Sequence, residues 1–364
     1  MKKIFTKEIM RWHSEENKRI MPWKGIKDPY KIWISEVILQ QTRVVQGVAY
    51  YNNFIQNFPT LASLALADEQ SVFKVWEGLG YYSRCKNLLY TARQILETRN
   101  GIFPETYEEI LELKGIGPYT ASAIASFAYG LPHAVVDGNV FRVLARFFGI
   151  DIPVDSNAGK KHFTTLANEL LYKHDPAKYN QAIMDFGATI CKPQNPICDS
   201  CVLSKQCFAY NQHFVSKLPV KEKELKKRTR WLTYFVFLVD GKVLIKRRSE
   251  KDIWENLFEF YLVESEGDLK WTTAEIESWL NRELTVHTFK INSVSRHYKQ
   301  QLTHQRLNGR FISITLDSVP ETLLHYTKAD FRDLTKVPFP QLINQYLQEN
   351  KDEHNGYGSL QKDF

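Results

Sequence analysis

The sequence predicts a multidomain protein whose first part is all-α and whose second part is α+β. The chain of 364 residues is longer than one domain commonly is. Up to about residue 212, apolar residues recur at three- and four-residue spacing, which is typical of helices. Beyond residue 230, runs rich in β-branched and aromatic residues predict strands.

Composition and charge restrict the classes of protein that this chain can belong to. Hydrophobic residues make up 43% and charged residues 24%, as in folded globular proteins and unlike disordered ones. No apolar run reaches the roughly 18 residues of a membrane-spanning helix, and the Met-Lys-Lys start lacks the apolar block of a signal peptide. We therefore expect a cytoplasmic protein without a membrane partner. The net charge of +7 favours a polyanionic partner.

The helical part shows its clearest helix start at Asp28, a capping residue that Pro29 follows at the first turn. Apolar positions continue this predicted helix to Val48. Further helices are predicted over residues 67–78, 82–97, 107–113, 119–128, 140–148, 160–171 and 178–190.

A basic stretch separates the two parts. Residues 215–230 carry seven Lys or Arg against two Glu, so we interpret residues 213–230 as a linker between domains at 1–212 and 231–347. The linker either lies along a phosphate backbone or is a solvated spacer, and the sequence leaves both open. The tail, 348–364, has little to bury and is expected to be disordered.

The second part begins with a hairpin signal. Two strand-like runs, 231–239 and 242–248, flank the turn Asp240-Gly241. Further strand-like runs are 258–264, 285–298 and 307–316, with a helix at 273–280.

Four of the five cysteines lie within 17 residues, in the spacing C-x6-C-x2-C-x5-C. Four thiolates can ligate a tetrahedral zinc ion or a [4Fe–4S] cluster. Zinc sites usually combine two close cysteine pairs and only one is present, so the spacing favours a cluster; unliganded thiols are the third possibility. All ligands would be protein groups, so we expect a structural role for Cys191, Cys198, Cys201 and Cys207.

Three further features carry candidate chemistry. Leu113–Gly117 is a helix-hairpin-helix signature, whose glycines can turn N–H groups towards a phosphate oxygen, or else an ordinary turn. Asp137 precedes a helix, and a carboxylate that accepts backbone N–H bonds is expected to stay ionised. Glu36 lies on or beside an apolar stripe with Ile32 and Leu39, where desolvation raises its pKa and makes it a proton donor; the alternative is a surface Glu.

The hairpin, Asp137 about twenty residues later and the cysteine loop, in this order, resemble the endonuclease III superfamily of DNA glycosylases. Within it, residues 29–44 and 78–88 look like the MutY-type adenine glycosylases. The resemblance covers about residues 11–207 and implies a helix-hairpin-helix domain with a [4Fe–4S] cluster. The implied partner is double-stranded DNA containing adenine opposite 8-oxoguanine or guanine. We expect a monomer, associated with the nucleoid if the cell is bacterial.

The resemblance also implies catalytic roles. Glu36 matches the general acid that protonates adenine at N7, and Asp137 supplies negative charge near an oxocarbenium-like sugar or bonds transiently to C1′. Asn139 matches a residue that assists at the sugar and the water. Bifunctional relatives carry a lysine where this chain has Tyr119, so monofunctional base excision is expected, with Tyr119 positioning the sugar or Asp137.

Base flipping requires a pocket and groups that enter the DNA helix. By resemblance, Gln41 and Tyr81 enter the helix, and Lys114 contacts a phosphate together with the hairpin glycines Gly115 and Gly117. The residues that match the family's adenine pocket are Arg19, Trp23, Lys24, Leu39 and Gln181.

The second domain resembles the Nudix-like module of MutY proteins. Thr273 stands where a complete Nudix metal motif needs a glutamate, so pyrophosphate hydrolysis is not expected. The family's 8-oxoguanine recognition loop matches Leu302-Thr303-His304, in which Leu302 replaces an aromatic residue. Two other functions remain as alternatives: a bifunctional glycosylase-lyase for oxidised pyrimidines, and a non-enzymatic, redox-responsive DNA-binding protein.

Overall fold

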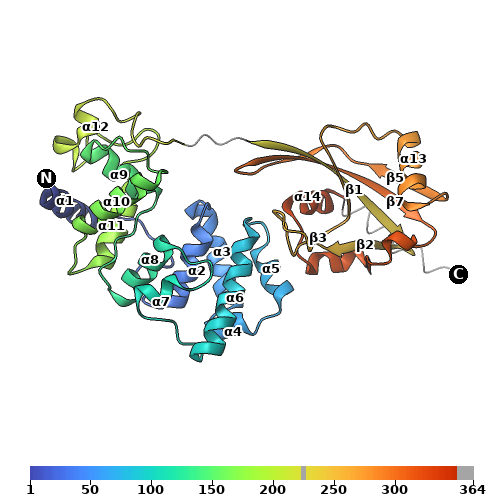
Figure 1. The fold of residues 1–364 in the computed structure, drawn as a ribbon, viewed down its shortest axis with the longest axis horizontal. Coiled ribbons are helices and arrows are strands. Elements are labelled where there is room, and N and C mark those ends of the chain that lie inside the picture. Colours follow the sequence, from blue (N-terminus) through green and yellow to red (C-terminus); the bar gives the residue numbers. More distant parts are fainter. Residues whose placement is uncertain (223–226, 351–364) are drawn as a thin grey trace. The chain divides into compact units, whose positions relative to one another are not determined.

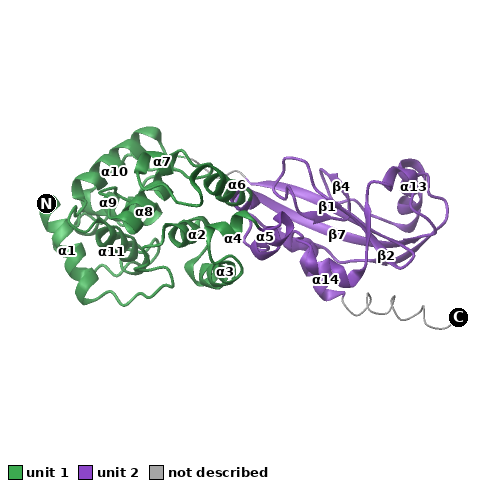
Figure 2. Cartoon of the chain, turned by 90° about the horizontal axis from the view of Figure 1, so that it is seen from below, with its two compact units in different colours: residues 1–66, 86–224 green, residues 67–85, 225–364 purple. Residues whose placement is uncertain are grey.

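The computed structural model describes residues 1–222 and 227–350, and the chain divides into two compact units. Residues 1–66 and 86–224 form the first unit, and residues 67–85 group with the chain from residue 225 onward in the second (Figure 2). The predicted fold class, all-α followed by α+β, is confirmed. The predicted domain limits stay a prediction, and residues 351–364 of the predicted tail lie outside the described residues.

The N-terminal part of the chain is helical (Figure 1). Its helices belong to the first unit, except that α5 and the first four residues of α6 group with the second. None of the helices in the described residues is long and apolar enough to cross a membrane. The helices of the N-terminal part are α1 (Lys2–Glu15), α2 (Pro29–Leu39), α3 (Val44–Asn57), α4 (Leu61–Ala65), α5 (Glu69–Trp76), α6 (Tyr82–Arg99), α7 (Tyr107–Leu111), α8 (Pro118–Tyr129), α9 (Gly138–Phe148), α10 (Asn157–Leu170), α11 (Pro176–Thr189) and α12 (Phe208–Asn211).

The start of α2 is as predicted, but its end is not. The Asp28 side chain accepts the N–H groups of Tyr30 and Lys31, which satisfies two of the free donors at the helix start. The predicted single helix to Val48 is wrong, because α2 ends at Leu39 and α3 begins at Val44. Gln41 between them has φ 61, a left-handed conformation that a helix cannot contain.

Aromatic residues of α1, α9 and α11 form a hydrophobic core in the first unit. Phe5 and Phe147 are fully buried with ring centroids 4.8 Å apart, and Trp12 meets Phe186 edge-on at 5.1 Å. Burying each such side chain stabilises the fold by about 2 kcal/mol. This packing holds α9 and α11 together, and both carry candidate site residues.

The second unit contains a mixed eight-stranded sheet in the order β3-β2-β1-β7-β5, with β4 on β1, β6 on β7 and β8 on β2. Strands β1 and β7 pair in parallel, and the other pairs are antiparallel. The elements are β1 (Arg228–Val239), β2 (Lys242–Arg247), β3 (Phe258–Glu259), β4 (Tyr261–Ser265), α13 (Thr273–Leu284), β5 (Phe289–Val294), β6 (Tyr298–Gln301), β7 (Gln305–Leu316), β8 (Thr327–Ala329) and α14 (Gln341–Glu349).

The predicted hairpin between β1 and β2 is confirmed. Asp240 and Gly241 both have positive φ, as a two-residue turn between right-twisted strands requires. Phe235 on β1 stacks on Trp279 of α13 at 4.3 Å, which packs this helix on the sheet. The predicted run 285–298 contains β5 and the first residue of β6.

Candidate active site

Glu36 lies on the buried face of α2 and is 6% exposed. Burial is the main reason why its pKa is raised from 4.5 to about 7. The charge of Asp137 raises the pKa further, and a hydrogen bond with Tyr119 opposes both effects. A carboxyl group with this pKa holds a proton in a large fraction of molecules at neutral pH, as the sequence predicted for a proton donor.

Tyr119 stands in the first turn of α8, immediately after the hairpin. Its hydroxyl donates to Sδ of Met184 at 3.8 Å and also interacts with the Glu36 carboxyl group. Burial, together with the charges of Glu36 and Asp137, raises the pKa of Tyr119 well above its usual value. It therefore stays a neutral hydrogen-bond donor. The two roles predicted for Tyr119, positioning the sugar or positioning Asp137, stay predictions.

The hairpin itself needs its first glycine. Gly115 has φ 81, and a Cβ there would lie 2.7 Å from Cβ of Asn87. Gly117 is the N-cap of α8. Lys114 is exposed, with its Nζ 4.2 Å from the ring centroid of Tyr90, and its side chain is accessible to a phosphate.

Asp137 is the N-cap of α9. Its Oδ1 accepts the N–H of Val140 at 2.8 Å, and its Oδ2 accepts Nδ2 of Asn139 at 2.6 Å. These bonds were expected to keep the pKa low, yet burial outweighs them and the pKa of Asp137 is raised above its usual 3.8. Asn139 Oδ1 in turn accepts Nη2 of Arg142 at 2.9 Å.

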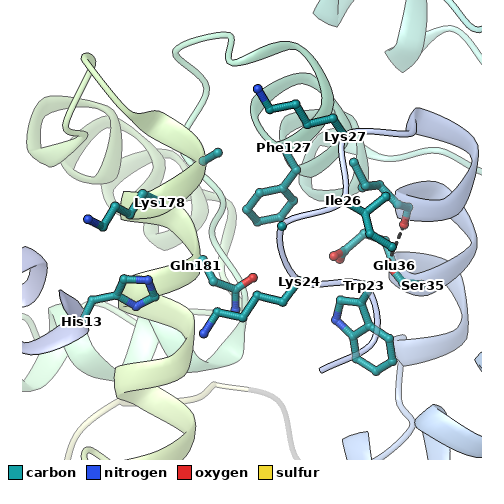
Figure 3. A pocket seen from close by; sticks show the side chains of 13 residues that line it. His13, Trp23, Lys24, Ile26, Lys27, Ser35, Glu36, Phe127, Lys178 and Gln181 are labelled. Atoms are coloured by element: carbon teal, nitrogen blue, oxygen red, sulfur yellow. Dashed lines mark hydrogen bonds between the residues drawn. The ribbon is translucent and has the colours of Figure 1, made fainter. Parts of the chain in front are cut away.

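A cavity of about 310 Å³ lies beside Glu36. Figure 3 shows Trp23 and Glu36 on one side and His13 and Lys178 on the other, with the side chains of Lys24 and Gln181 between them. Of the predicted pocket residues, Trp23, Lys24 and Gln181 line the cavity, and Arg19 and Leu39 do not. Of the predicted catalytic residues, Glu36 lines it, whereas Tyr119, Asp137 and Asn139 do not.

Asp185, which sequence reasoning missed, organises the polar wall of this cavity. It is fully buried on α11 and accepts Arg19 Nη1 at 2.8 Å, Lys24 Nζ at 3.0 Å and Gln181 Nε2 at 3.1 Å. Asn17 Nδ2 adds a fourth bond at 2.8 Å. The signal in the sequence was an aspartate inside an apolar helix, four residues after Gln181, because a buried charge needs partners.

The other predicted DNA-contact residues lie outside this cavity. Gln41 is exposed in the left-handed turn between α2 and α3. Tyr81 is 41% exposed with φ 49, and its hydroxyl hydrogen-bonds that of Thr303, 222 residues away. Thr303 and His304 form the turn between β6 and β7, where the His304 carbonyl accepts the N–H of Arg228 at 3.0 Å.

The four clustered cysteines line one cavity together with Arg146. Arg146 Nη1 approaches Cys191 Sγ at 3.6 Å, and the N–H of Leu203 approaches Cys201 Sγ at 3.4 Å. Such donors suit metal-bound thiolates. Among the described residues, no group of three or more His, Cys, Asp or Glu side chains is placed to hold a single metal ion.

Comparisons with known proteins identify the class. Residues 34–168 match the HhH-GPD superfamily of base excision DNA repair proteins, and residues 233–349 match the NUDIX domain. A solved structure of a thermostable thymine-DNA glycosylase superimposes with a TM-score of 0.54 at 30% identity, covering 58% of this chain and 97% of that one. An endonuclease III–DNA complex shares the fold with a TM-score of 0.51 at 19% identity, covering 58% and 98%. The chain is thus a helix-hairpin-helix DNA N-glycosylase of base excision repair.

Sequence relatives narrow this class. The adenine DNA glycosylase of Buchnera aphidicola subsp. Baizongia pistaciae is 34% identical over 322 residues, which cover 87% of each chain. That of Homo sapiens is 40% identical over 214 residues, or 56% of this chain and 39% of the human one. The chain belongs to the adenine DNA glycosylase family, and the predicted resemblance is confirmed.

Proposed function

We propose that this chain is a monofunctional adenine DNA glycosylase that removes adenine mispaired with 8-oxoguanine or guanine from duplex DNA. The observation that carries the proposal is Glu36, a buried carboxyl group with a pKa of about 7 on the wall of a cavity. Adenine is a poor leaving group, so cleavage of its bond to deoxyribose needs a proton on the base. Protonated Glu36 supplies it at N7.

The cavity offers an extruded base an apolar surface and fixed polar groups. Trp23, which is 8% exposed, supplies the apolar surface. Lys24 and Gln181 supply the polar groups. Because Asp185 holds both polar side chains, they are oriented before the base enters. A base that enters this cavity has left the stack of the duplex.

Asp137 and Asn139 act at the sugar in this proposal. The N–H of Val140, the amide of Asn139 and the positive charge of Arg142 all favour the charged form of Asp137. Burial raises the pKa of both carboxyl groups, but these three groups favour the anion of Asp137. Because two anions would repel each other, the proposal places the proton on Glu36 and the negative charge on Asp137. That charge stabilises the oxocarbenium-like sugar as the base leaves.

The hairpin supports a monofunctional enzyme. Tyr119 occupies the position at which a lyase needs an amine, and its neutral hydroxyl lies beside Glu36, whose pKa it influences. Water rather than a lysine then completes the reaction, and the product is an abasic site. Lys114, Gly115 and Gly117 hold the DNA backbone at this hairpin, which presents the sugar to Asp137.

Recognition of 8-oxoguanine belongs to the second unit in this proposal. Tyr81, Thr303 and His304 all belong to that unit, and the bond between the Tyr81 and Thr303 hydroxyls brings two predicted contact residues together. Gln41 enters the DNA from the first unit. We propose that the enzyme acts as a monomer on genomic DNA in the cytoplasm, at the nucleoid if the cell is bacterial.

The cysteine loop holds a [4Fe–4S] cluster in this proposal. Ligands of one zinc ion at about 2.3 Å stand about 3.8 Å apart, whereas the ligands of a cubane bind four separate irons and stand farther apart. The four thiols line one cavity, and their spacing C-x6-C-x2-C-x5-C, with a single close pair, favours the second arrangement. The cluster, when bound, ties α11 to α12 and supplies structural support.

One assay separates the three candidate functions. Duplexes with adenine opposite 8-oxoguanine, adenine opposite guanine, or an oxidised thymine are incubated with the protein and then analysed with and without alkali. Adenine-specific breaks that require alkali are the expected result. Alkali-independent breaks at the thymine lesion indicate the bifunctional enzyme instead, and binding without breaks indicates the non-enzymatic protein.

Two variants test the catalytic pair. Glu36→Gln and Asp137→Asn each remove one role while keeping the shape of the side chain, so excision should fall at least about a hundredfold while DNA binding persists. Glu97→Gln, at an exposed position of α6, is the matched control. Wild-type turnover in either variant removes that residue from the mechanism.

A further inference from the structure

The segment from Ala67 to Cys85 is helical sequence that folds with the C-terminal unit (Figure 2). At one end of α5, Glu69 forms an ion pair with Arg247 of β2 at 3.1 Å. At the other end, Lys74 Nζ donates to the Val337 carbonyl at 3.1 Å. Contacts at both ends attach α5 to the unit that contains Thr303.

The loop that follows α5, Gly78–Tyr81, is called the Tyr81 loop here. Its backbone has φ 91 at Gly78, 73 at Gly80 and 49 at Tyr81. The last of these is strained, because a residue with a Cβ adopts the left-handed region at a cost of about 1 kcal/mol. Trp76 Nε1 and Arg84 Nη2 each donate to the Gly80 carbonyl at 3.2 Å and help to hold this shape.

Glu77 connects this loop to a rigid part of the C-terminal unit. Its Oε1 accepts the N–H of Phe339 at 2.7 Å, and its Oε2 accepts Lys74 Nζ at 2.7 Å. Phe339 is fully buried against Phe260, and the Pro338 carbonyl accepts the N–H of Phe258 from β3 at 2.8 Å. The two partners of Glu77, Phe339 and Lys74, are therefore both held by the C-terminal unit. Glu77, which immediately precedes the Tyr81 loop, is held in place with them.

We propose that Glu77, supported by Lys74, is a positioning residue for lesion recognition. Glu77 joins the end of α5 to the backbone at Phe339. This contact holds the Tyr81 loop in the position in which the Tyr81 hydroxyl bonds to that of Thr303. Discrimination between 8-oxoguanine and guanine opposite adenine then depends on a carboxylate that touches no DNA. This proposal rests on the function proposed above, because it assigns Tyr81 and Thr303 to the base opposite adenine.

The test compares Glu77→Ala with Glu69→Ala in the full-length holoprotein. Both variants remove a contact between α5 and the C-terminal unit, but Glu69 lies at the far end of the helix from the loop. The ratio of kcat/KM for adenine opposite 8-oxoguanine over adenine opposite guanine is expected to fall about tenfold in Glu77→Ala, or about 1.4 kcal/mol. The ratio should stay within about twofold of wild type in Glu69→Ala.

Two further measurements separate positioning from a general loss of structure. Glu77→Gln keeps an acceptor for the Phe339 N–H and should restore most of the ratio. In a double-mutant cycle, the double variant Glu77→Ala/Thr303→Val should have nearly the same ratio as Glu77→Ala alone. Both changes break the same arrangement, so their effects should not add.

Hydrogen exchange of the amides in the Tyr81 loop gives a readout that does not depend on activity. Glu77→Ala should speed this exchange at least about tenfold, while Glu69→Ala leaves it unchanged. Unchanged exchange, an unchanged ratio, or an equal fall in the Glu69→Ala control overturns the proposal. If the wild type does not excise adenine, the proposed function fails, and the exchange rates alone decide whether Glu77 holds the loop.

Discussion

Replacing Glu36 by glutamine should stabilise the folded protein, and by an amount that grows with pH. The pKa of Glu36 is about 7 in the fold against 4.5 for an ordinary glutamate, a difference of about 2.5. One pKa unit is equivalent to about 1.36 kcal/mol, so the buried carboxylate lowers stability by about 3 kcal/mol once both states are ionised. The glutamine of the variant carries no charge and escapes this penalty.

The sign and the pH range follow from the two pKa values. Below pH 4.5, Glu36 is protonated in both states and has no pH-dependent effect. Between 4.5 and about 7 the unfolded chain loses its proton first, so the wild type loses stability as the pH rises, until the folded carboxyl group is also ionised. The advantage of Glu36→Gln should grow by roughly 2 to 3 kcal/mol between about pH 5 and pH 8.

Urea denaturation of the holoprotein at both pH values measures this difference. Glu97→Gln, the exposed control on α6, should show no growth of this kind between the two pH values. A stability difference for Glu36→Gln that is the same at both pH values would show that the carboxyl group titrates as in the unfolded chain. The argument for Glu36 as a proton donor at neutral pH would then be lost.

Four further results are expected. The single-turnover rate of adenine excision should fall as the pH rises through about 7, because Glu36 must be protonated to act, and a pH–rate profile measures it. Asp185→Asn leaves Arg19 and Lys24 without their carboxylate, so denaturation should show a loss of about 3 kcal/mol, with excision impaired more than DNA binding. Gly115→Ala places a Cβ at a backbone φ of 81 and against Asn87, which distorts the hairpin, so affinity for duplex DNA should fall roughly tenfold in a binding titration. Cys201→Ser removes one ligand of the proposed cluster, so the purified protein should lose the visible absorbance and bound iron expected of the wild type.

Local signals in the sequence predicted the features that depend on near neighbours. Asp28 before Pro29 marked a helix start, and Asp240-Gly241 marked a hairpin, because capping and turn geometry involve only a few residues. Glu36 beside an apolar stripe indicated a raised pKa, because desolvation follows from the helical face on which a residue lies.

Features that depend on the tertiary fold could not be predicted in this way. The break at Gln41 interrupts a periodicity that continues on both sides of it, so the pattern does not reveal the turn. The raised pKa of Asp137 reflects its burial in the folded chain, which a capping motif does not report. Asp185 was visible as an aspartate in an apolar helix, but its partners Arg19 and Lys24 lie more than 160 residues earlier.

The grouping of residues 67–85 with the C-terminal unit affects how the protein can be divided. The chain passes from one unit to the other three times, after Leu66, Cys85 and Glu224. A fragment cut at the basic linker therefore keeps α5 but loses the backbone groups of Val337 and Phe339 that α5 and Glu77 bind. The two halves on either side of residue 224 are not independent modules, and a truncated N-terminal enzyme is an imperfect stand-in for the same region in the whole chain.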